Sequence, residues 1–317
     1  MSTGPAFRIF RSLAELPRDF GPTVAAIGNF DGVHLGHQRI LSAVVSQARE
    51  LSARAVVITF DPHPEFFLRP SQAPALLTPI DERLRLLAMT GIDAVLVLPF
   101  DAALAELPAR EFVRQILVER LRLVALHEGG NFRFGRRAEA GVSELARFGW
   151  ESGFTLHIHP AVSIHGMEVS SSAIRALVAA GDVRRARWLL GRPFNVRSTQ
   201  VRDRGVGTER LVPTVNLAPY EGLLPANGVY VCRITIDGRP FQAVTNAGDR
   251  PTFAGASYSV ESHILNFEPI EMTEATPIDL EFILRLRGER KFSSSEALKT
   301  QILHDVACAQ RFFRLAK

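Results

Sequence analysis

The chain of 317 residues carries 37 Lys and Arg against 33 Asp and Glu, a formal net charge of +4. Hydrophobic residues make up 46% of the chain and charged residues 22%, which is typical of globular proteins and excludes a disordered chain. The length suits two domains, and so small a net charge gives no indication of a nucleic-acid partner.

The only two cysteines, Cys232 and Cys308, lie far apart and form no C-x-x-C motif. We expect both to be reduced thiols, one in a strand and one in a helix. No charged-then-apolar leader opens the sequence, and no apolar run approaches membrane-spanning length. We therefore expect a soluble, cytoplasmic protein that acts on small molecules, with no nucleic-acid or membrane partner; the sequence gives no indication of self-association.

Apolar runs alternate with helical patterns over the first half of the chain. After a leading strand and turn within Phe7–Asp19, the apolar runs predict strands at Val24–Ile27, Ala55–Phe60, Ala94–Leu98, Leu123–Leu126 and Phe154–His159. The helical patterns cover His37–Arg54, Asp81–Met89, Pro108–Arg120 and Val142–Trp150. Strand, crossover helix and strand in succession predict an α/β domain with a Rossmann-like parallel sheet.

The stretch Ala25–Ile40 reads as strand, glycine-bearing turn and helix N-terminus. Such a junction presents free backbone N–H groups and the positive end of the helix dipole, which suit a phosphate chain. His34 and His37 are three apart, with Gly36 between them, so both side chains can point at one anion while the backbone approaches closely. H-x-G-H here is similar to the signature of nucleotidylyltransferases. The alternative is a surface turn with two solvated histidines.

Two further stretches follow predicted strands at the same edge of the sheet, where ligands bind in open α/β folds. Asp61-Pro62-His63-Pro64 is a stiff loop after the second strand; the alternative is a plain strand-ending turn. Gly129–Arg136 places a glycine-flanked amide, Asn131, and arginines after the fourth strand. Phosphates or a ribose are the expected ligands there.

Serines at Ser170, Ser171 and Ser172 open the next helix, and Arg175 lies in its first turn. Hydroxyl and N–H groups at a helix start suit a phosphate, although a serine N-cap with a solvated arginine is the alternative. A metal site at His157, His159 and His165 is not expected, because no Cys, Asp or Glu completes a ligand set at useful spacing.

The pattern changes at about Phe194, after a short helix at Val183–Leu190. Short strands are predicted at Gly228–Ile236, Phe241–Thr245, Tyr258–Leu265 and Ile278–Leu286, with a hairpin turn at Asp237-Gly238. Ser293–Ser295 precede a terminal helix, Glu296–Leu315. We predict two domains, residues 1–193 and 194–317, the second a small antiparallel β-barrel with a C-terminal helix.

These motifs together are similar to a known family. The first half resembles the FMN adenylyltransferase domain of prokaryotic bifunctional riboflavin kinase/FAD synthetases through G-N-F-D-G-V-H-L-G-H-Q (28–38), T-F-D-P-H-P (59–64), G-N-F-R-F-G (130–135) and S-S-x-I-R ending at Arg175. The second half resembles the riboflavin kinase module through P-T-V-N (213–216), L-P-A-N-G-V-Y (224–230), N-A-G-D-R-P-T-F (246–253) and V-E-S-H-I-L-N-F (260–267). The resemblance covers nearly the whole chain in the expected order.

The resemblance implies FAD biosynthesis in two steps. ATP phosphorylates riboflavin to FMN, and the FMN phosphate then attacks the α-phosphate of a second ATP, giving FAD and pyrophosphate; both steps use Mg²⁺. The implied catalytic residues are His34, His37, Asn131 and Glu261, the last as base on the riboflavin hydroxyl. The implied nucleotide- and phosphate-binding residues are Gly28, Asn29, Phe30, Asp31, Gly36, Ser170, Ser171, Ser172 and Arg175. The flavin would lie against Asp61, Pro62, His63 and Pro64, and Thr214 and Asn216 would hold Mg²⁺ with ATP.

The kinase half departs from the family's glycine-rich segment. Ser198, Asp203 and Leu211 replace glycines, and Gly207 remains. Glycine is used where backbone approaches phosphate, and a carboxylate there repels it. This leaves two alternatives to the bifunctional enzyme: an FMN adenylyltransferase with an impaired kinase module, and a non-catalytic flavin-binding regulator.

Overall fold

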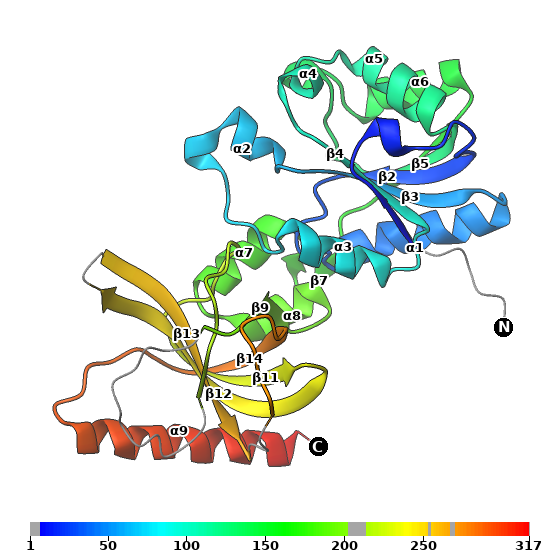
Figure 1. Cartoon of the computed structure of the whole chain (residues 1–317). Helices are drawn as coiled ribbons and strands as arrows, with labels where there is room; N and C mark the ends of the chain where they lie inside the picture. The colour runs from blue at the N-terminus through cyan, green and yellow to red at the C-terminus, as the bar shows by residue number, and fades with distance from the viewer. Residues whose placement is uncertain (1–6, 202–213, 253–254, 267–269, 317) are drawn as a thin grey trace. The chain divides into compact units, whose positions relative to one another are not determined.

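In a computed structural model of the chain, the described residues are 7–201, 214–252, 255–266 and 270–316. They form two compact units, unit 1 (Met1–Ser171) and unit 2 (Ser172–Lys317), each with its own sheet (Figure 1). This division falls after Ser171, because the helix pair that follows clusters with the second sheet. The domain boundary at 193/194 that the sequence predicts stays a prediction.

Unit 1 is built on a six-stranded parallel sheet with strand order β1-β4-β3-β2-β5-β6. The strands are β1 (Arg8–Phe10), β2 (Thr23–Ile27), β3 (Arg54–Phe60), β4 (Ala94–Leu98), β5 (Leu123–Gly129) and β6 (Thr155–His159). The predicted parallel sheet is confirmed. The ends of the five predicted strands differ from the observed ends by three residues at most. Apolar runs form the central strands β2 to β5, which are buried because helices cover both faces of the sheet there.

The two faces of this sheet bury alternate residues of each strand. Val24 and Ala26 pack with Leu41 of α1 (Leu35–Glu50) and with α3 (Ile80–Ala88). Ala25 and Ile27 pack against the opposite layer (Figure 1). That layer contains α5 (Ala109–Phe112), the π-helical η3 (Val113–Arg120) and α6 (Val142–Ser152). The single helix predicted at Pro108–Arg120 is thus an α-turn that continues with π-helical hydrogen bonding.

Short elements complete unit 1 around the edges of the sheet. They are η1 (Leu13–Glu15), α2 (Pro64–Leu68), η2 (Pro70–Gln72), α4 (Ala102–Ala105), η4 (Arg136–Ala138) and the hairpin strands β7 (Ser163–Ile164) and β8 (Met167–Glu168).

Unit 2 contains a six-stranded antiparallel sheet with strand order β10-β13-β12-β11-β14-β9. Its strands are β9 (Phe194–Ser198), β10 (Thr214–Asn216), β11 (Gly228–Ile236), β12 (Arg239–Thr252), β13 (Gly255–Leu265) and β14 (Ile278–Gly288). Its helices are α7 (Ser171–Ala179), α8 (Val183–Leu190) and α9 (Ser295–Leu315). The predicted hairpin turn is confirmed: Asp237 and Gly238 join β11 to β12, both with positive φ.

The two edge strands of this sheet meet, so the sheet closes into a barrel. The N–H of Val201 donates to the carbonyl of Asn216 at 3.0 Å, and the N–H of Ala218 donates to the carbonyl of Thr199 at 2.9 Å. Because closure pairs the edges, it removes unsatisfied strand hydrogen bonds. The predicted antiparallel barrel is confirmed.

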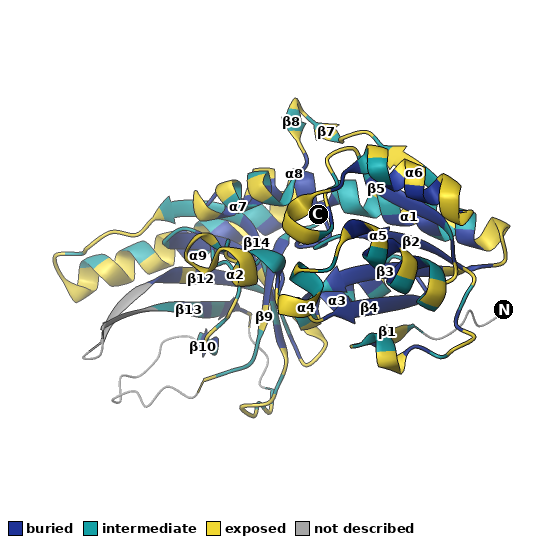
Figure 2. Ribbon diagram, turned by 90° about the horizontal axis from the view of Figure 1, so that it is seen from above, coloured by how far each residue is buried: buried dark blue, intermediate teal, exposed yellow. Residues whose placement is uncertain are grey.

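Alternate residues of the barrel strands serve two separate cores. Tyr230, Cys232 and Phe282 point inward and are fully buried. Val229, Val231 and Val244 lie on the outer face, where they pack with Phe313 of α9. In Figure 2 the strands are largely dark blue, which marks buried residues, whereas the helices carry yellow, exposed residues. The expected positions of the cysteines are confirmed, Cys232 in β11 and Cys308 in α9, and both are free thiols.

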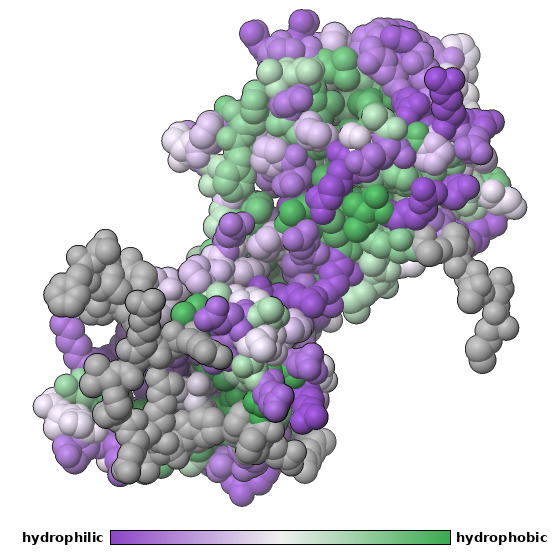
Figure 3. Space-filling model, viewed as in Figure 1, coloured by the Kyte–Doolittle hydropathy of each residue, from purple (hydrophilic) through white to green (hydrophobic). Residues whose placement is uncertain are grey.

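On the face seen in Figure 3, hydrophilic and hydrophobic residues alternate over both units. Among the residues that the structure describes, no helix has the length and apolar character needed to cross a membrane.

Candidate functional site

A cavity of about 520 Å³ opens in unit 1 beside the carboxyl ends of β2 and β5. This is the point at which the strand order reverses, because β3 and β4 follow β2 on one side and β5 lies on the other. Ligands bind at such a point in open α/β sheets. The sequence-predicted residues on the wall are Phe30, His34, Gly36, His37, Asn131, Ser170 and Ser171.

His34 and His37 face the cavity from the first turn of α1. His34 is the N-cap residue, and its Nδ1 accepts a hydrogen bond from the N–H of His37 at 3.3 Å. The two rings are stacked, with centroids 3.6 Å apart. Burial, then the His34 ring and the Arg83 guanidinium, lower the pKa of His37 well below its ordinary value. His37 is therefore a neutral imidazole, able to donate one N–H to an anion.

The Asp31 side chain holds the loop between β2 and α1 in place. This buried carboxylate accepts hydrogen bonds from the N–H of Leu77 at 3.0 Å, the N–H of Thr78 at 2.9 Å and the hydroxyl of Thr78 at 3.1 Å. The carbonyl of Asn29 accepts from the hydroxyl of Thr59 at 3.3 Å. Gly28, Asn29 and Asp31 lie behind the wall of the cavity rather than on it.

The predicted phosphate-binding serines are divided between the two units. Ser170 and Ser171 line the cavity, and the Ser171 hydroxyl donates to the carbonyl of Asp31 at 2.8 Å. Ser172 and Arg175 belong to unit 2, so their part in phosphate binding stays a prediction.

The predicted flavin loop, Asp61–Pro64, follows β3 but does not line the cavity. His63 is the N-cap residue of α2, and its Nδ1 accepts from the N–H of Glu65 at 3.2 Å. Beneath this loop Arg83 is completely buried, and its Nη1 donates to the carbonyl of Phe60 at 3.2 Å. Its Nε and Nη2 have no partner among the described residues.

Two acidic residues on the wall of the cavity, Glu128 and Glu168, were not singled out from the sequence, and His159 was considered there only as a candidate metal ligand. Glu128 lies two residues beyond the predicted strand Leu123–Leu126, and His159 ends the predicted strand Phe154–His159, both at the edge of the sheet that carries the motifs. The rule that ligands bind at that edge could therefore have indicated them.

The three candidate metal-binding histidines do not converge. His157 and His159 belong to a hydrogen-bonded group with His127 and Gln47, in which His127 Nδ1 lies 2.9 Å from His159 Nε2. His165 lies in the turn between β7 and β8. No group of three potential ligands able to hold a metal ion occurs among the residues described.

A second cavity, of about 360 Å³, lies in unit 2 between the barrel and α9. Thr214 and Glu261 are on its wall, together with Asn246 and His263. Asn216 lies opposite Glu261 in the register of β10 and β13, and Asn246 lies opposite Glu261 on the other side. Residues in register share a face of the sheet, so these three polar side chains form one row.

An ion pair fixes α9 over this second cavity. Arg287 of β14 donates from Nη2 to Oδ2 of the buried Asp305 at 2.8 Å, and Gln301 donates to Oδ1 at 2.6 Å. Both charged residues line the cavity and were not identified from the sequence.

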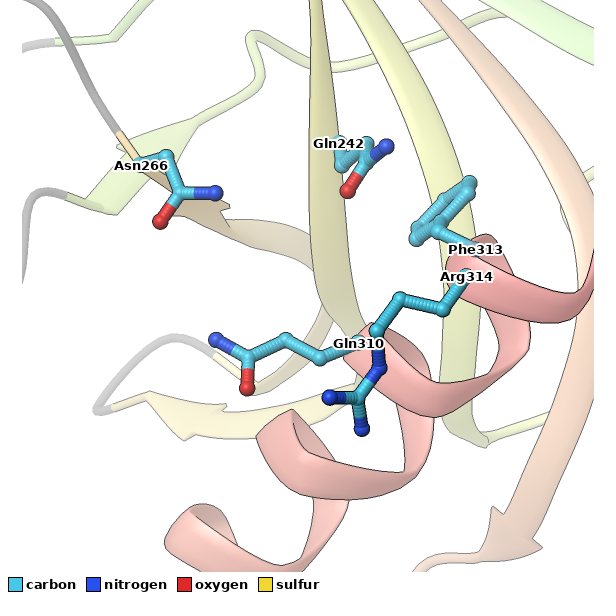
Figure 4. Close-up of a pocket in the computed structure, with 5 residues that line it drawn as sticks. All are labelled: Gln242, Asn266, Gln310, Phe313 and Arg314. Atoms are coloured by element: carbon cyan, nitrogen blue, oxygen red, sulfur yellow. The ribbon is translucent and has the colours of Figure 1, made fainter. Parts of the chain in front are cut away.

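The substituted glycine positions lie partly outside the described residues, as Asp203 and Leu211 do. Ser198 ends β9, and its hydroxyl donates to the carbonyl of Ala218 at 3.0 Å. A third cavity, of about 290 Å³, lies at the other end of α9, lined by Gln242, Asn266, Gln310, Phe313 and Arg314 (Figure 4). None of the predicted site residues lies on its wall.

Comparisons with known proteins find matches over both halves of the chain. The family model for FAD synthetase matches residues 16–173, and the model for riboflavin kinase matches residues 190–313. Curated relatives described as bifunctional riboflavin kinase/FMN adenylyltransferase include those of Pseudomonas fluorescens, 36% identical over 96% of this chain and 97% of the relative, and Escherichia coli K12, 34% identical over 98% of each. A solved structure described as a macrolide-efflux protein from Streptococcus pneumoniae has a TM-score of 0.84 at 25% identity, covering 96% of this chain and 98% of that one.

Proposed function

The chain belongs to the family of bifunctional riboflavin kinase/FMN adenylyltransferases, and from this we infer that it makes FAD from riboflavin in two steps. ATP phosphorylates riboflavin to FMN, and a second ATP adenylylates FMN to FAD with release of pyrophosphate. The resemblance seen in the sequence is thereby confirmed at the level of the family, and the chain is an enzyme. The observation that supports the assignment of residues is that His34, His37 and Asn131 line one cavity within unit 1, and that Thr214 and Glu261 line one within unit 2.

In unit 1, we assign adenylyl transfer to the cavity at the start of α1. An oxygen of the FMN phosphate attacks the α-phosphorus of ATP, and the bond from that phosphorus to the bridging oxygen of pyrophosphate breaks. Negative charge builds up on the α-phosphate oxygens, where neutral His37, His34 and the N-terminus of α1 supply N–H donors and a positive dipole. The hydrogen bonds from these preorganised donors become stronger as the charge develops, and this lowers the activation free energy of adenylyl transfer.

Asn131 and the serines complete this arrangement. The Asn131 Oδ1 lies 3.2 Å from where a Cβ on Gly129 would be, so Gly129 leaves room for the amide beside the cavity. We assign Asn131 to orienting the α-phosphate, and Ser170 and Ser171 to holding the phosphate chain. Ser172 and Arg175 would add to this set, and the loop Asp61–Pro64 would hold the flavin ring, as the family resemblance implies.

In unit 2, we assign phosphorylation of riboflavin to the cavity under α9. Glu261 would accept the proton of the ribityl 5′-hydroxyl as the hydroxyl oxygen bonds to the γ-phosphorus of ATP and the bond to the β,γ-bridging oxygen breaks, releasing ADP. Asn216, in register with Glu261, and Thr214, two residues before it on β10, offer oxygen ligands that fit Mg²⁺, which prefers oxygen donors. When bound, Mg²⁺ neutralises charge on the phosphates. Val229, Val244 and Phe292 give this cavity an apolar wall suited to a flavin ring.

A reciprocal pair of variants tests these assignments. His37→Ala should lower the rate of FAD formation from FMN by ~10²–10³-fold, the loss typical of removing one transition-state donor, and leave riboflavin phosphorylation unchanged. Glu261→Gln should abolish FMN formation and leave FMN adenylylation unchanged. His304→Ala and Glu281→Gln, at partly or fully exposed positions away from both cavities, are the matched controls. Loss of both activities in either variant, or of neither, would contradict the assignment.

A further inference from the structure

Glu128 lies where the binding crevice of unit 1 begins. It belongs to β5, and its Oε1 accepts a hydrogen bond from the N–H of Ile27, the last residue of β2, at 2.7 Å. β2 and β5 are the two strands between which the strand order reverses. The carboxyl group therefore bridges the two strands at the position where a nucleotide binds in this class of sheet.

This carboxyl group is held without a cationic partner. Glu128 is 4% exposed and lines the cavity. No ion pair to it occurs within the described part of the chain. Burial raises its pKa well above the ordinary value, and the N–H groups of Ile27 and Gly129 offset this only in part. Burial without a cationic partner favours the neutral form of the group, in which one oxygen accepts the Ile27 hydrogen bond and the other can carry a proton.

Other titratable groups on the same wall come from three elements. They are His34 and His37 of α1, His159 of β6, near Arg39, and Glu168 of β8. His37 and His159 have lowered pKa values and are neutral as well.

The cavity's wall indicates which part of a ligand meets Glu128. The phosphates belong with the histidines and the start of α1, whereas Ile40, Phe132 and Ile158 give an apolar surface suited to a flat ring. The predicted flavin loop, Asp61–Pro64, is not on this wall. The purine of ATP is a flat ring of this kind, and its ring nitrogens accept hydrogen bonds.

We propose that Glu128, as a protonated carboxyl, donates a hydrogen bond to a ring nitrogen of the adenine of ATP and so determines how tightly unit 1 binds the nucleotide. The proposal deepens the proposed function, because it takes this cavity as the ATP site of adenylyl transfer. An ionised carboxylate has no proton to donate, and both its oxygens and the adenine ring nitrogen are hydrogen-bond acceptors. The hydrogen bond is therefore lost when Glu128 ionises.

Steady-state adenylylation of FMN by the full chain, with ATP varied, tests this. Glu128→Leu should lower kcat/KM for ATP by about tenfold or more, mainly through KM, as expected for a buried hydrogen bond. Glu128→Gln, whose amide both accepts and donates, should recover about fivefold or more of that loss. The wild-type kcat/KM should fall at alkaline pH as Glu128 ionises, and this fall should be absent in Glu128→Gln. Glu119→Gln, an exposed carboxylate paired with Arg114, is the control.

Deaza analogues of ATP locate the acceptor. The affinities of the 1-, 3- and 7-deaza compounds are measured by calorimetry without FMN. For the wild type, one of them should bind about tenfold more weakly than ATP. For Glu128→Leu, that same compound and ATP should bind with equal affinity. Equal ATP affinity in the wild type and Glu128→Leu, or equal losses in Glu128→Leu and Glu128→Gln, would overturn the proposal. So would equal discrimination by both proteins against every deaza analogue.

Riboflavin phosphorylation, measured in the same variants, reports whether unit 2 is intact, and thermal unfolding reports whether unit 1 is folded. A wild type that does not adenylylate FMN would instead overturn the proposed function of unit 1, and this proposal with it.

Discussion

The imidazole rings of His34 and His37 stack at 3.6 Å with an interplanar angle of 15°, and Gly36 is what leaves room for them. A Cβ on Gly36 would lie 3.2 Å from both Cε1 and Nδ1 of His34. The sequence suggests that this glycine lets the backbone approach a phosphate. The structure adds a second reason, because a side chain there would push the His34 ring away from His37.

Gly36→Ala should therefore separate activity from stability. Alanine raises helix propensity by up to about 1 kcal/mol, so the free energy of unfolding should be unchanged or higher. FAD formation from FMN should fall by about tenfold or more, because the His34 ring is displaced. Chemical denaturation and adenylylation kinetics measure the two effects. Ser42→Ala, exposed on the same helix, is the control; full activity in Gly36→Ala would show that the stacked rings are not needed.

Asp31 should contribute mainly to the stability of unit 1. Asp31→Ala removes a buried acceptor and leaves donors of Leu77 and Thr78 without partners, which should lower the free energy of unfolding by about 2–4 kcal/mol. Asp31→Asn, which keeps one oxygen, should lose less. Hydrogen exchange of unit 1 amides in increasing denaturant measures this free energy of unfolding. Asp81→Ala, at a largely exposed position, should change stability little; an equally small effect at Asp31 would contradict the account.

The histidine group around His127 should make unit 1 less stable in acid. Burial, His157 and His159 lower the pKa of His127 to about 4, against 6.5 in the unfolded chain. Between these values the unfolded state binds the extra proton, so stability falls as the pH falls, by up to about 1.4 kcal/mol per pH unit from this group. Denaturation midpoints at pH 7, 6 and 5 should show this slope. His127→Gln should flatten it and His304→Gln should not; equal slopes in all three proteins would refute it.

Thr214→Ala should change the magnesium requirement of only one activity. If Thr214 holds Mg²⁺ with ATP in unit 2, the concentration of Mg²⁺ that gives half-maximal riboflavin phosphorylation should rise by about tenfold. The requirement of FMN adenylylation should stay the same, and a chelator should abolish both reactions. Thr300→Ala, exposed on α9, is the control. An unchanged requirement for phosphorylation would remove Thr214 from the metal site.

The parallel sheet of unit 1 could be predicted because its local signals agree with the fold. Residues such as Val56 to Ile58 lie in an unbroken apolar run, which is what a strand covered on both faces requires. The edge strands β9 and β10 of the barrel could not be predicted, because they are short and their pairing joins segments far apart in the sequence. The closure through Val201 and Asn216 leaves no local pattern to recognise.

The candidate sites show the same limit at the level of single residues. His34, His37 and Asn131 belong to motifs, so their gathering at one cavity could be expected. Arg83 and Glu128 carry no motif: on a helix or strand pattern each is an ordinary charged residue, and only their burial makes them notable. Burial of a charged group is decided by tertiary packing, which periodicity does not report.

The central claim is that one chain performs both reactions although Ser198, Asp203 and Leu211 stand at usual glycine positions. The most direct measurement is chromatography of the products formed by the purified protein with Mg²⁺ and ATP, supplied separately with riboflavin and with FMN. The account predicts FAD from both substrates, with FMN as an intermediate when riboflavin is supplied. FAD from FMN alone would contradict it and show that the substituted segment has disabled the kinase. Neither product, from folded protein, would favour a flavin-binding regulator.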